Sequence, residues 1–238
     1  MQGLPFKGIV NKMPKKNSLK VYVEGGYYHI YNRGVEKRKI FEDNRDHKVF
    51  LNNLKESLSP PPKPEDVKIT FTLQGLPFKG VPRLPKNFYK EIDLLAYCLM
   101  PNHFHLLIKQ TNSGSMQSFM SSICTRYSMY FNKKYSRIGR LFQGPYKAVL
   151  VTEEPYLLHL SRYIHLNPSE YKDNLTLAYS SYADYLGKRN TVWVKPDMVL
   201  SFFNQTTIPE LEKFNSYKDF VEKYKKDISK IFGELTLD

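Results

Sequence analysis

The sequence of 238 residues predicts an α+β fold in which helices pack on an antiparallel sheet. The main observation is the order of its segments, strand–helix–strand–strand–helix–strand–helix, which is typical of that class. Its 41% hydrophobic and 14% aromatic residues can fill a core, so a wholly disordered chain is excluded. No apolar run approaches the ~20 residues of a membrane-spanning helix. Two cysteines, Cys98 and Cys124, are too few for a disulfide scaffold or a four-cysteine zinc site, and we expect a cytoplasmic protein with both thiols reduced.

The first part of the chain is expected to supply one strand and one helix. Tyr27–Arg33 has strand character, and Asn32-Arg33-Gly34 provides its exit turn. Asp43 or Asn44 can cap the next helix. The apolar residues of that helix recur at helical spacing: Val49, Phe50, Leu54 and Leu58.

A Pro-rich insert is expected at residues 59–86. It holds seven of the 15 prolines and one predicted strand, Lys68–Leu73. Within it, Gln74–Gly80 repeats Gln2–Gly8 letter for letter, which is too short for a structural repeat unit. We interpret the repeated segment as an element outside the core.

The rest of the chain is expected to complete the sheet and its helices. Pro101-Asn102 is the predicted turn of a hairpin. The predicted elements are strands over Asp93–Met100 and His103–Gln110, a helix over Met116–Tyr135, a strand over Tyr146–Thr152, a helix from Glu153-Glu154 that ends at Pro168, and helices over Pro196–Phe203 and Thr207–Phe232.

Charge indicates a polyanionic partner. The formal net charge is +13, and no Asp or Glu occurs between Leu94 and Thr152. Seven basic residues lie in that stretch, interleaved with aromatic ones, and cations beside rings suit single-stranded or hairpin nucleic acid. The alternative is a helix with aromatic core contacts and a solvated basic face. The basic residues of the stretch are Lys109, Arg126, Lys133, Lys134, Arg137, Arg140 and Lys147.

Two imidazoles are the first candidates for chemistry. His103 and His105 lie two apart on a predicted strand, so both point to one face. Together they can hold a divalent metal, although ordinary half-buried histidines remain the alternative. Tyr163 and Asn167 lie four apart on one face of the predicted helix that Pro168 ends. A packing role is the alternative for the tyrosine.

Four sequence blocks resemble a known family. Met100-Pro101-Asn102-His103-Phe104-His105-Leu106-Leu107 resembles the histidine–hydrophobe–histidine (HUH) motif of single-tyrosine transposases. The other blocks are Tyr28–Gly34, Gly139–Lys147 and Ser161–Pro168. In this order they resemble REP-associated tyrosine transposases, relatives of the insertion-sequence-200-like transposases.

The resemblance implies a ferredoxin-like core and a DNA strand-transfer enzyme. It implies that Tyr163 attacks a phosphodiester of single-stranded DNA, forming a 5′-phosphotyrosine and a free 3′-hydroxyl. It further implies a Mg²⁺ or Mn²⁺ ion on His103 and His105, with Asn167 as third ligand. The expected DNA-binding residues are Arg33, Arg126, Lys133, Lys134, Arg137, Arg140 and Lys147.

The expected organisation is a transposase domain with two extensions. Residues 1–22 form a basic N-terminal extension, 23–188 the HUH domain with its insert at 59–86, and 189–238 a helical C-terminal extension. The expected partner is single-stranded or hairpin DNA in a prokaryotic, nucleoid-associated setting, without a membrane. A monomer is expected, with a homodimer as the alternative.

The sequence also departs from the family pattern. Asn167-Pro168 is followed by Ser169-Glu170-Tyr171, where relatives often have Val-Arg-Ala, so an arginine contact is lost. Two other functions stay open. One is a catalytically silent hairpin-DNA-binding protein with a regulatory or architectural role. The other is an RNA-binding ferredoxin-like domain, which predicts paired aromatic residues on an exposed sheet face.

Overall fold

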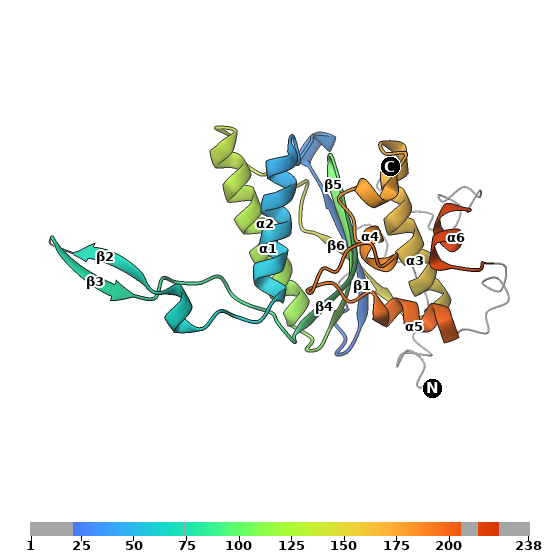
Figure 1. Cartoon of the computed structure of the whole chain (residues 1–238). Coiled ribbons are helices and arrows are strands. Elements are labelled where there is room, and N and C mark those ends of the chain that lie inside the picture. The colour runs from blue at the N-terminus through green and yellow to red at the C-terminus, as the bar shows by residue number, and fades with distance from the viewer. Residues whose placement is uncertain (1–20, 74, 206–213, 224–238) are drawn as a thin grey trace.

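A four-stranded antiparallel sheet with strand order β4-β5-β1-β6 forms the centre of the protein (Figure 1). The structure, a computed structural model, describes residues 21–73, 75–205 and 214–223. Without the insert, the element order is strand–helix–strand–strand–helix–strand, and the first strand lies between the third and fourth. This is the ferredoxin-like arrangement, so the predicted fold class is confirmed. The strands are β1 (Tyr27–Arg33), β4 (Ile92–Met100), β5 (His103–Gln110) and β6 (Lys147–Val151).

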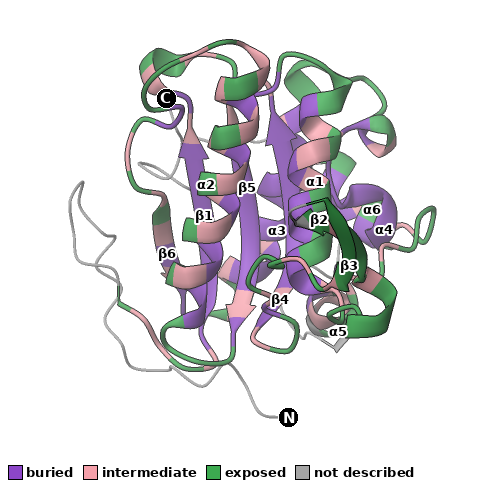
Figure 2. Ribbon diagram, turned by 90° about the vertical axis from the view of Figure 1, so that its left-hand side faces the viewer, coloured by how far each residue is buried: buried purple, intermediate pink, exposed green. Residues whose placement is uncertain are grey.

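Helices cover both faces of the sheet. α1 (Asn44–Leu58) and α2 (Ser115–Lys134) pack on one face, and α3 (Glu154–Leu166) packs on the other (Figure 1). The short helix α4 (Tyr182–Tyr185), which the sequence did not predict, lies on the α3 side with α5 (Asp197–Gln205) and α6 (Tyr217–Glu222). The protein therefore has two cores, one on each side of the sheet, and buried residues follow the strands in Figure 2.

Alternation along β1 separates the two cores. Tyr28 and Ile30 belong to the core beneath α1 and α2, whereas Tyr27 and Tyr31 belong to the core beneath α3. Successive side chains of a strand point to opposite faces, so each strand contributes to both layers. The side chains of β5 divide in the same way, with Phe104 beneath α1 and α2.

The start of α1 shows how local sequence fixes an element. Of the two predicted caps, Asp43 is the N-cap: its Oδ1 accepts hydrogen bonds from the backbone N–H groups of Arg45 at 2.8 Å and Asp46 at 3.0 Å. The Asp46 carboxylate in turn accepts from the Asp43 N–H at 3.4 Å. This reciprocal capping box satisfies donors that the first turn leaves without helical partners.

The Pro-rich insert forms an exposed hairpin. The predicted strand appears as β2 (Ile69–Leu73), and it pairs with β3 (Leu76–Gly80), a strand that was not predicted. β3 includes Pro77, which weakens the strand signal in the sequence. The repeated segment Gln74–Gly80 supplies β3, which lies outside both cores.

The predicted helix over Thr207–Phe232 is wrong as one continuous helix. Residues 214–216 are not helical, and the Ser216 hydroxyl caps α6 by accepting from the Asp219 N–H at 3.1 Å. The flanking residues 206–213 and 224–232 lie outside the described residues. Within the described residues, none of the helices is both long and apolar enough to cross a membrane.

A buried histidine joins α3 to the C-terminal elements. His165 Nδ1 lies 2.9 Å from the Tyr217 hydroxyl of α6, and its Nε2 lies 2.8 Å from Ser181 Oγ. The Tyr217 hydroxyl also donates to Ser161 Oγ at 2.9 Å. Burial lowers the pKa of His165 to about 3, and the neighbouring Arg189 acts in the same direction.

This histidine makes folding stability depend on pH. Between pH ~6.5 and ~3 the unfolded chain binds a proton at His165 that the folded chain does not, so the free energy of unfolding falls as the pH falls. The expected contribution of His165 is a loss of about 2 kcal/mol between pH 7 and pH 5. Urea unfolding at both pH values should show a smaller loss for His165→Gln than for the wild type. Tyr217→Phe keeps the imidazole buried and should keep the full loss; an unchanged loss in His165→Gln would contradict the assignment.

Candidate active site

Backbone hydrogen bonds bring separate sequence blocks together at one end of β1. The Arg33 carbonyl accepts from the Gln143 N–H at 2.9 Å, and the Asn32 side chain donates to the Gly144 carbonyl at 3.1 Å. These bonds fix the block Gly139–Lys147 beside the block Tyr28–Gly34. Arg33 Nε also donates to Gln143 Oε1 at 2.5 Å.

The turn before His103 is held by the segment after β1. The Gly34 N–H donates to the Asn102 carbonyl at 2.8 Å, and the Ile40 N–H donates to the Pro101 carbonyl at 2.8 Å. Gly34 is required here, since a Cβ at this position would lie 2.2 Å from the Arg38 carbonyl oxygen. The start of β5 is therefore placed by contacts with the last residue of the block Tyr28–Gly34 and with the segment that follows that block.

His103 and His105 lie on the α3 face of β5. Their ring centroids are 5.0 Å apart and the rings are nearly perpendicular. His103 is half-buried, and its Nδ1 lies 2.6 Å from the amide oxygen of Asn102. Because that oxygen can only accept, Nδ1 carries the proton of a neutral His103 and Nε2 carries the lone pair. This is the form of imidazole that binds a metal.

His29, which the sequence analysis missed, lies against His105. Its Nε2 is 2.9 Å from His105 Nδ1, and the two rings stack with centroids 5.0 Å apart. Both side chains are fully buried. The missing signal was the strand pairing: Tyr31 lies opposite His105, so His29 shares its face two residues along β1. Strand parity within each segment could not reveal which strands are neighbours.

Burial keeps these imidazoles neutral. It lowers the pKa of His29 to about 3, and it lowers the pKa of His105 well below 6.5 with additional effects of His103 and His29. In the described structure His105 Nε2 and His29 Nδ1 have no hydrogen-bond partner. If His105 Nδ1 donates to His29, then His105 Nε2 carries a buried lone pair directed away from that hydrogen bond. This nitrogen can serve as a metal ligand.

Tyr163 reaches the histidines from α3. Its ring centroid lies 5.3 Å from that of His105 and 6.1 Å from that of His29, edge to face in both cases. The residue is 7% exposed. The helix thus packs across the sheet with Tyr163 directed at the histidine pair.

Asn167 directly follows the last residue of α3, four residues after Tyr163. Its Nδ2 donates to the Tyr163 carbonyl at 2.8 Å, which fixes the amide beside the tyrosine backbone. In the described ranges, no group of three His, Cys, Asp or Glu side chains is arranged to hold a metal ion.

Two other tyrosines lie near the site in sequence. The Tyr146 hydroxyl lies 3.2 Å from the Tyr22 hydroxyl, and its ring packs against the core beneath α1 and α2, on the opposite side of the sheet from Tyr163. Tyr156 lies on α3 and packs against the same core as Tyr163. Tyr156 is therefore the tyrosine to compare with Tyr163.

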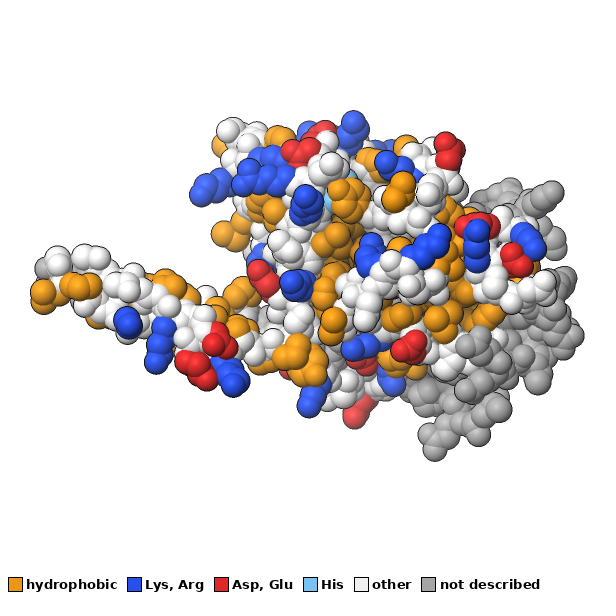
Figure 3. Space-filling view, viewed as in Figure 1, with side chains coloured by type: hydrophobic (Ala, Val, Ile, Leu, Met, Phe, Trp, Pro, Cys, Tyr) orange, Lys and Arg blue, Asp and Glu red, His pale blue; other side chains and the backbone are white. Residues whose placement is uncertain are grey.

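The predicted DNA-binding residues divide into two groups. Lys134 lies 2.7 Å from both Asp43 and Asp46, and Arg126 pairs with Glu56, so acids of α1 compensate these two charges. Lys147 is exposed, and its Nζ lies 5.6 Å from the Tyr31 ring on the site face. Of the others, Lys133 and Arg140 are exposed, whereas Arg33 and Arg137 are half-buried. Figure 3 shows several groups of Lys and Arg side chains on the face that it presents.

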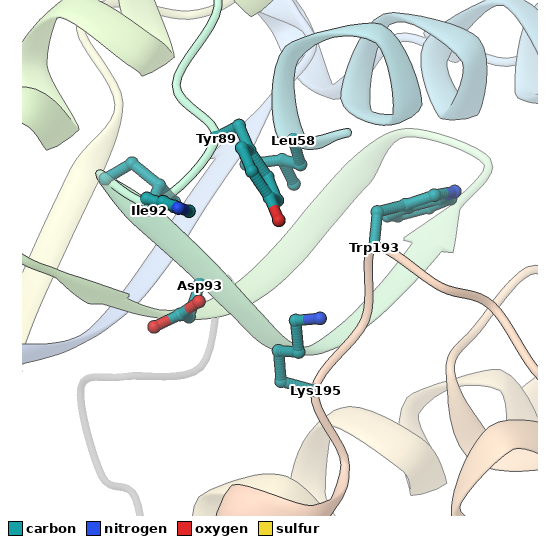
Figure 4. A pocket seen from close by; sticks show the side chains of 7 residues that line it. Leu58, Tyr89, Ile92, Asp93, Trp193 and Lys195 are labelled. Atoms are coloured by element: carbon teal, nitrogen blue, oxygen red, sulfur yellow. The ribbon is translucent and has the colours of Figure 1, made fainter. Parts of the chain in front are cut away.

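A shallow pocket lies at the other end of the sheet. Leu58, Tyr89, Ile92, Trp193 and Lys195 are among its lining residues (Figure 4). None of the predicted site residues lines it. It is separate from the histidine–tyrosine cluster, because Ile92 begins β4 and pairs with Gln110, whereas His103 pairs with the last residue of β4.

Comparison with known proteins confirms the family resemblance over part of the chain. Residues 87–167 match the family model of IS200-like transposases, and this segment includes His103, His105, Tyr163 and Asn167. The match supports a role in transposition and a DNA-processing activity. No curated protein matches the chain.

Solved structures that match this chain include a REP-associated tyrosine transposase bound to a REP hairpin. It is 8% identical with a TM-score of 0.47, and the match covers 76% of this chain and 98% of that one. A Deinococcus radiodurans R1 protein described provisionally as a transposase is 15% identical with a TM-score of 0.35, covering 63% and 95%.

The contact between His29 and His105 predicts a stability difference between variants. His29→Leu leaves His105 Nδ1 buried without a partner, which should lower the free energy of unfolding by about 1–3 kcal/mol. His103→Leu changes a half-buried side chain and should cost less than about 1 kcal/mol. Urea unfolding at pH 7 compares the two variants. Equal costs would show that the imidazole contact contributes nothing to stability.

Proposed function

Because residues 87–167 match the IS200-like transposases, we propose that this protein is a metal-dependent single-stranded DNA endonuclease and strand transferase. It cleaves near DNA hairpins through a covalent 5′-phosphotyrosine on Tyr163. The observation that carries the proposal is the position of the Tyr163 ring, 5.3 Å from His105 on the sheet face that also holds His103. Three separate elements contribute to that cluster: β1 with His29, β5 with the other two histidines, and α3 with the tyrosine.

The residues present fit a divalent metal of the Mg²⁺ or Mn²⁺ type. His103 Nε2 carries a lone pair, His105 Nε2 has no partner within the described structure, and Asn167 is the proposed third ligand. Mixed imidazole and oxygen ligands with open positions suit such an ion better than a structural zinc. The chemistry it supplies when bound is polarisation of the scissile phosphate and stabilisation of the leaving 3′-oxygen.

Tyr163 is the proposed nucleophile. Its hydroxyl oxygen forms a bond to phosphorus as the bond from phosphorus to the 3′-oxygen breaks. The hydroxyl proton leaves the tyrosine, and a proton is taken up by the 3′-oxygen. The phosphotyrosine conserves the energy of the phosphodiester, so attack by a 3′-hydroxyl reverses the step and joins strands.

The surroundings support binding of a polyanion. Lys147 lies on the site face, and the half-buried Arg137 and the exposed Arg140 follow α2 in the same acid-free stretch. Arg33 adds a guanidinium at the end of β1. We exclude Lys134 and Arg126 from the proposed contact surface, because acids of α1 already compensate them.

The nucleophile is tested with a matched pair of tyrosine variants. Tyr163→Phe removes one oxygen and keeps the ring, so folding and hairpin binding should persist while the covalent adduct falls to the no-enzyme level. The assay uses hairpin-bearing single-stranded oligonucleotides with Mn²⁺ and a denaturing gel. Tyr156→Phe on the same helix should retain the adduct; the opposite result would identify Tyr156 as nucleophile. Binding without any adduct in the wild type would favour the silent DNA-binding alternative.

The metal site is tested by binding and by activity. His103→Ala and His105→Ala should each abolish cleavage and Mn²⁺ binding, measured by electron paramagnetic resonance of the free ion, while DNA binding persists because basic residues supply it. His29→Leu removes the partner of His105 and should weaken Mn²⁺ binding about 10–100-fold. Unchanged Mn²⁺ binding in both alanine variants would place the ion elsewhere.

A further inference from the structure

The insert at residues 59–86, which we term the arm, projects away from the body of the protein. Figure 1 shows β2 and β3 extending beyond α1, on the side of the sheet opposite α3. The two strands form a separate two-stranded sheet. An isolated two-stranded hairpin is only marginally stable in water. Contact with a binding partner would therefore stabilise the arm.

The root of the arm is closed by hydrogen bonds. The Asn87 side chain donates to the carbonyls of Ser59 and Glu56, each at 2.9 Å, and the Phe88 N–H donates to the Ser57 carbonyl at 2.7 Å. The chain therefore leaves and re-enters the body at nearly the same point. The arm is an appendage whose ends are held by the body.

The two faces of the hairpin differ in chemistry. On one face Ile69 precedes Phe71, which lies opposite Phe78; on the other face Thr70 lies opposite Lys79. Leu76 is 73% exposed, and Phe78 and Ile69 are 47% and 46% exposed. The Phe71 and Phe78 rings stack on each other with centroids 5.4 Å apart. An apolar face thus lies open to solvent beside a polar, basic one.

The net charge of the arm indicates a polyanionic partner. The arm has five basic residues against two acids, a net charge of 5 − 2 = +3. In Figure 3, apolar atoms line one side of the arm, and the basic side chains lie along the other side together with the two acids near the root. The basic residues are Lys63, Lys68, Lys79, Arg83 and Lys86.

We propose that the arm is a second DNA contact, which grips double-stranded DNA flanking the cleaved strand. The proposal rests on the proposed function for DNA as the partner. A two-stranded ribbon fits a DNA groove, lysines at its side can meet phosphates, and apolar residues at a tip can wedge between base steps. Leu76 and Pro77, next to the hairpin turn, are the wedge residues. Duplex is favoured over single strands because Phe71 and Phe78 stack on each other rather than presenting separate platforms for bases.

The length of β4 gives the minimum length of duplex that can reach from His103 to the root of the arm. The arm re-enters just before β4, and His103 lies opposite the far end of that nine-residue strand. At about 3.3 Å per residue, the two ends of β4 are roughly 26 Å apart. A duplex rises 3.4 Å per base pair, so an extension shorter than about eight base pairs should not reach the arm.

The test measures affinity with and without a duplex extension. In the Tyr163→Phe background, which prevents cleavage, fluorescence anisotropy compares a 20-nucleotide single strand with the same strand carrying 4 or 20 base pairs of duplex. The 20-base-pair extension should tighten binding at least about fivefold, and the 4-base-pair extension should not. Replacing residues 60–86 by a short Gly-Ser linker across the closed root should abolish that gain and leave single-strand affinity unchanged.

Point variants separate the contacts and guard against misfolding of the shortened chain. Lys68→Gln with Lys79→Gln should lower the salt dependence of duplex binding by about 0.9 in log–log slope per lost phosphate contact. Leu76→Ser with Phe78→Ser should reduce the duplex gain without changing that slope. Lys218→Gln in α6 with Lys223→Gln directly after α6 is the matched charge control and should change neither.

Two results would overturn the proposal. One is a duplex gain that persists in the variants of the arm. The other is a wild-type dimer by light scattering that Leu76→Ser with Phe78→Ser converts to a monomer, which would assign the apolar face to a second copy of the chain. The proposed function is tested separately, by the covalent adduct that the wild-type protein forms on a single-stranded substrate. The binding assay of the arm requires no cleavage, so the two proposals can fail independently.

Discussion

The two-residue period of β1 and β5 is the constraint on which the rest of the structure depends. It directs His29 and His105 toward α3 and directs Ile30 and Phe104 toward α1 and α2. A shift of pairing by one residue would exchange these sets, burying imidazoles in an apolar layer and apolar side chains against Tyr163. The register that fills the cores is thus the same register that assembles the cluster. In this sheet, core packing and site geometry are therefore determined by the same strand register.

Much of the fold could be predicted because its signals are local. The strands predicted over Tyr27–Arg33 and His103–Gln110 have the observed bounds of β1 and β5, and Asp43, one of the two predicted caps, begins α1. β3 was missed because Pro77 argues against a strand, although it lies in an exposed two-stranded ribbon. The break at residues 214–216 was missed because Phe220 continues a helical apolar pattern, while the Ser216 cap interrupts it locally.

The site was less accessible to prediction because it depends on which distant segments become neighbours. Strand parity places His103 and His105 on one face, but the partner of His105 lies 76 residues away and follows only from the pairing of β1 with β5. In the basic stretch between Leu94 and Thr152, a pattern that is clear along the chain is changed by contacts in space. The stretch is free of acids along the chain, yet Asp46 of α1 and the N-cap residue Asp43 both form ion pairs with Lys134. The roles of Tyr163 and Asn167 stay proposals that this geometry supports.

The closed root at Ser59 and Asn87 also bears on how such a chain can change over evolution. A connection whose ends are already held together tolerates length variation, because each doubling of a flexible loop adds only roughly 0.6 kcal/mol to the entropy of closure. Segments can therefore be gained, lost or exchanged between α1 and β4 without disturbing the sheet. On the proposal that the arm contacts DNA, changes in this connection would alter target preference without changing the histidine–tyrosine cluster at the other end of the sheet.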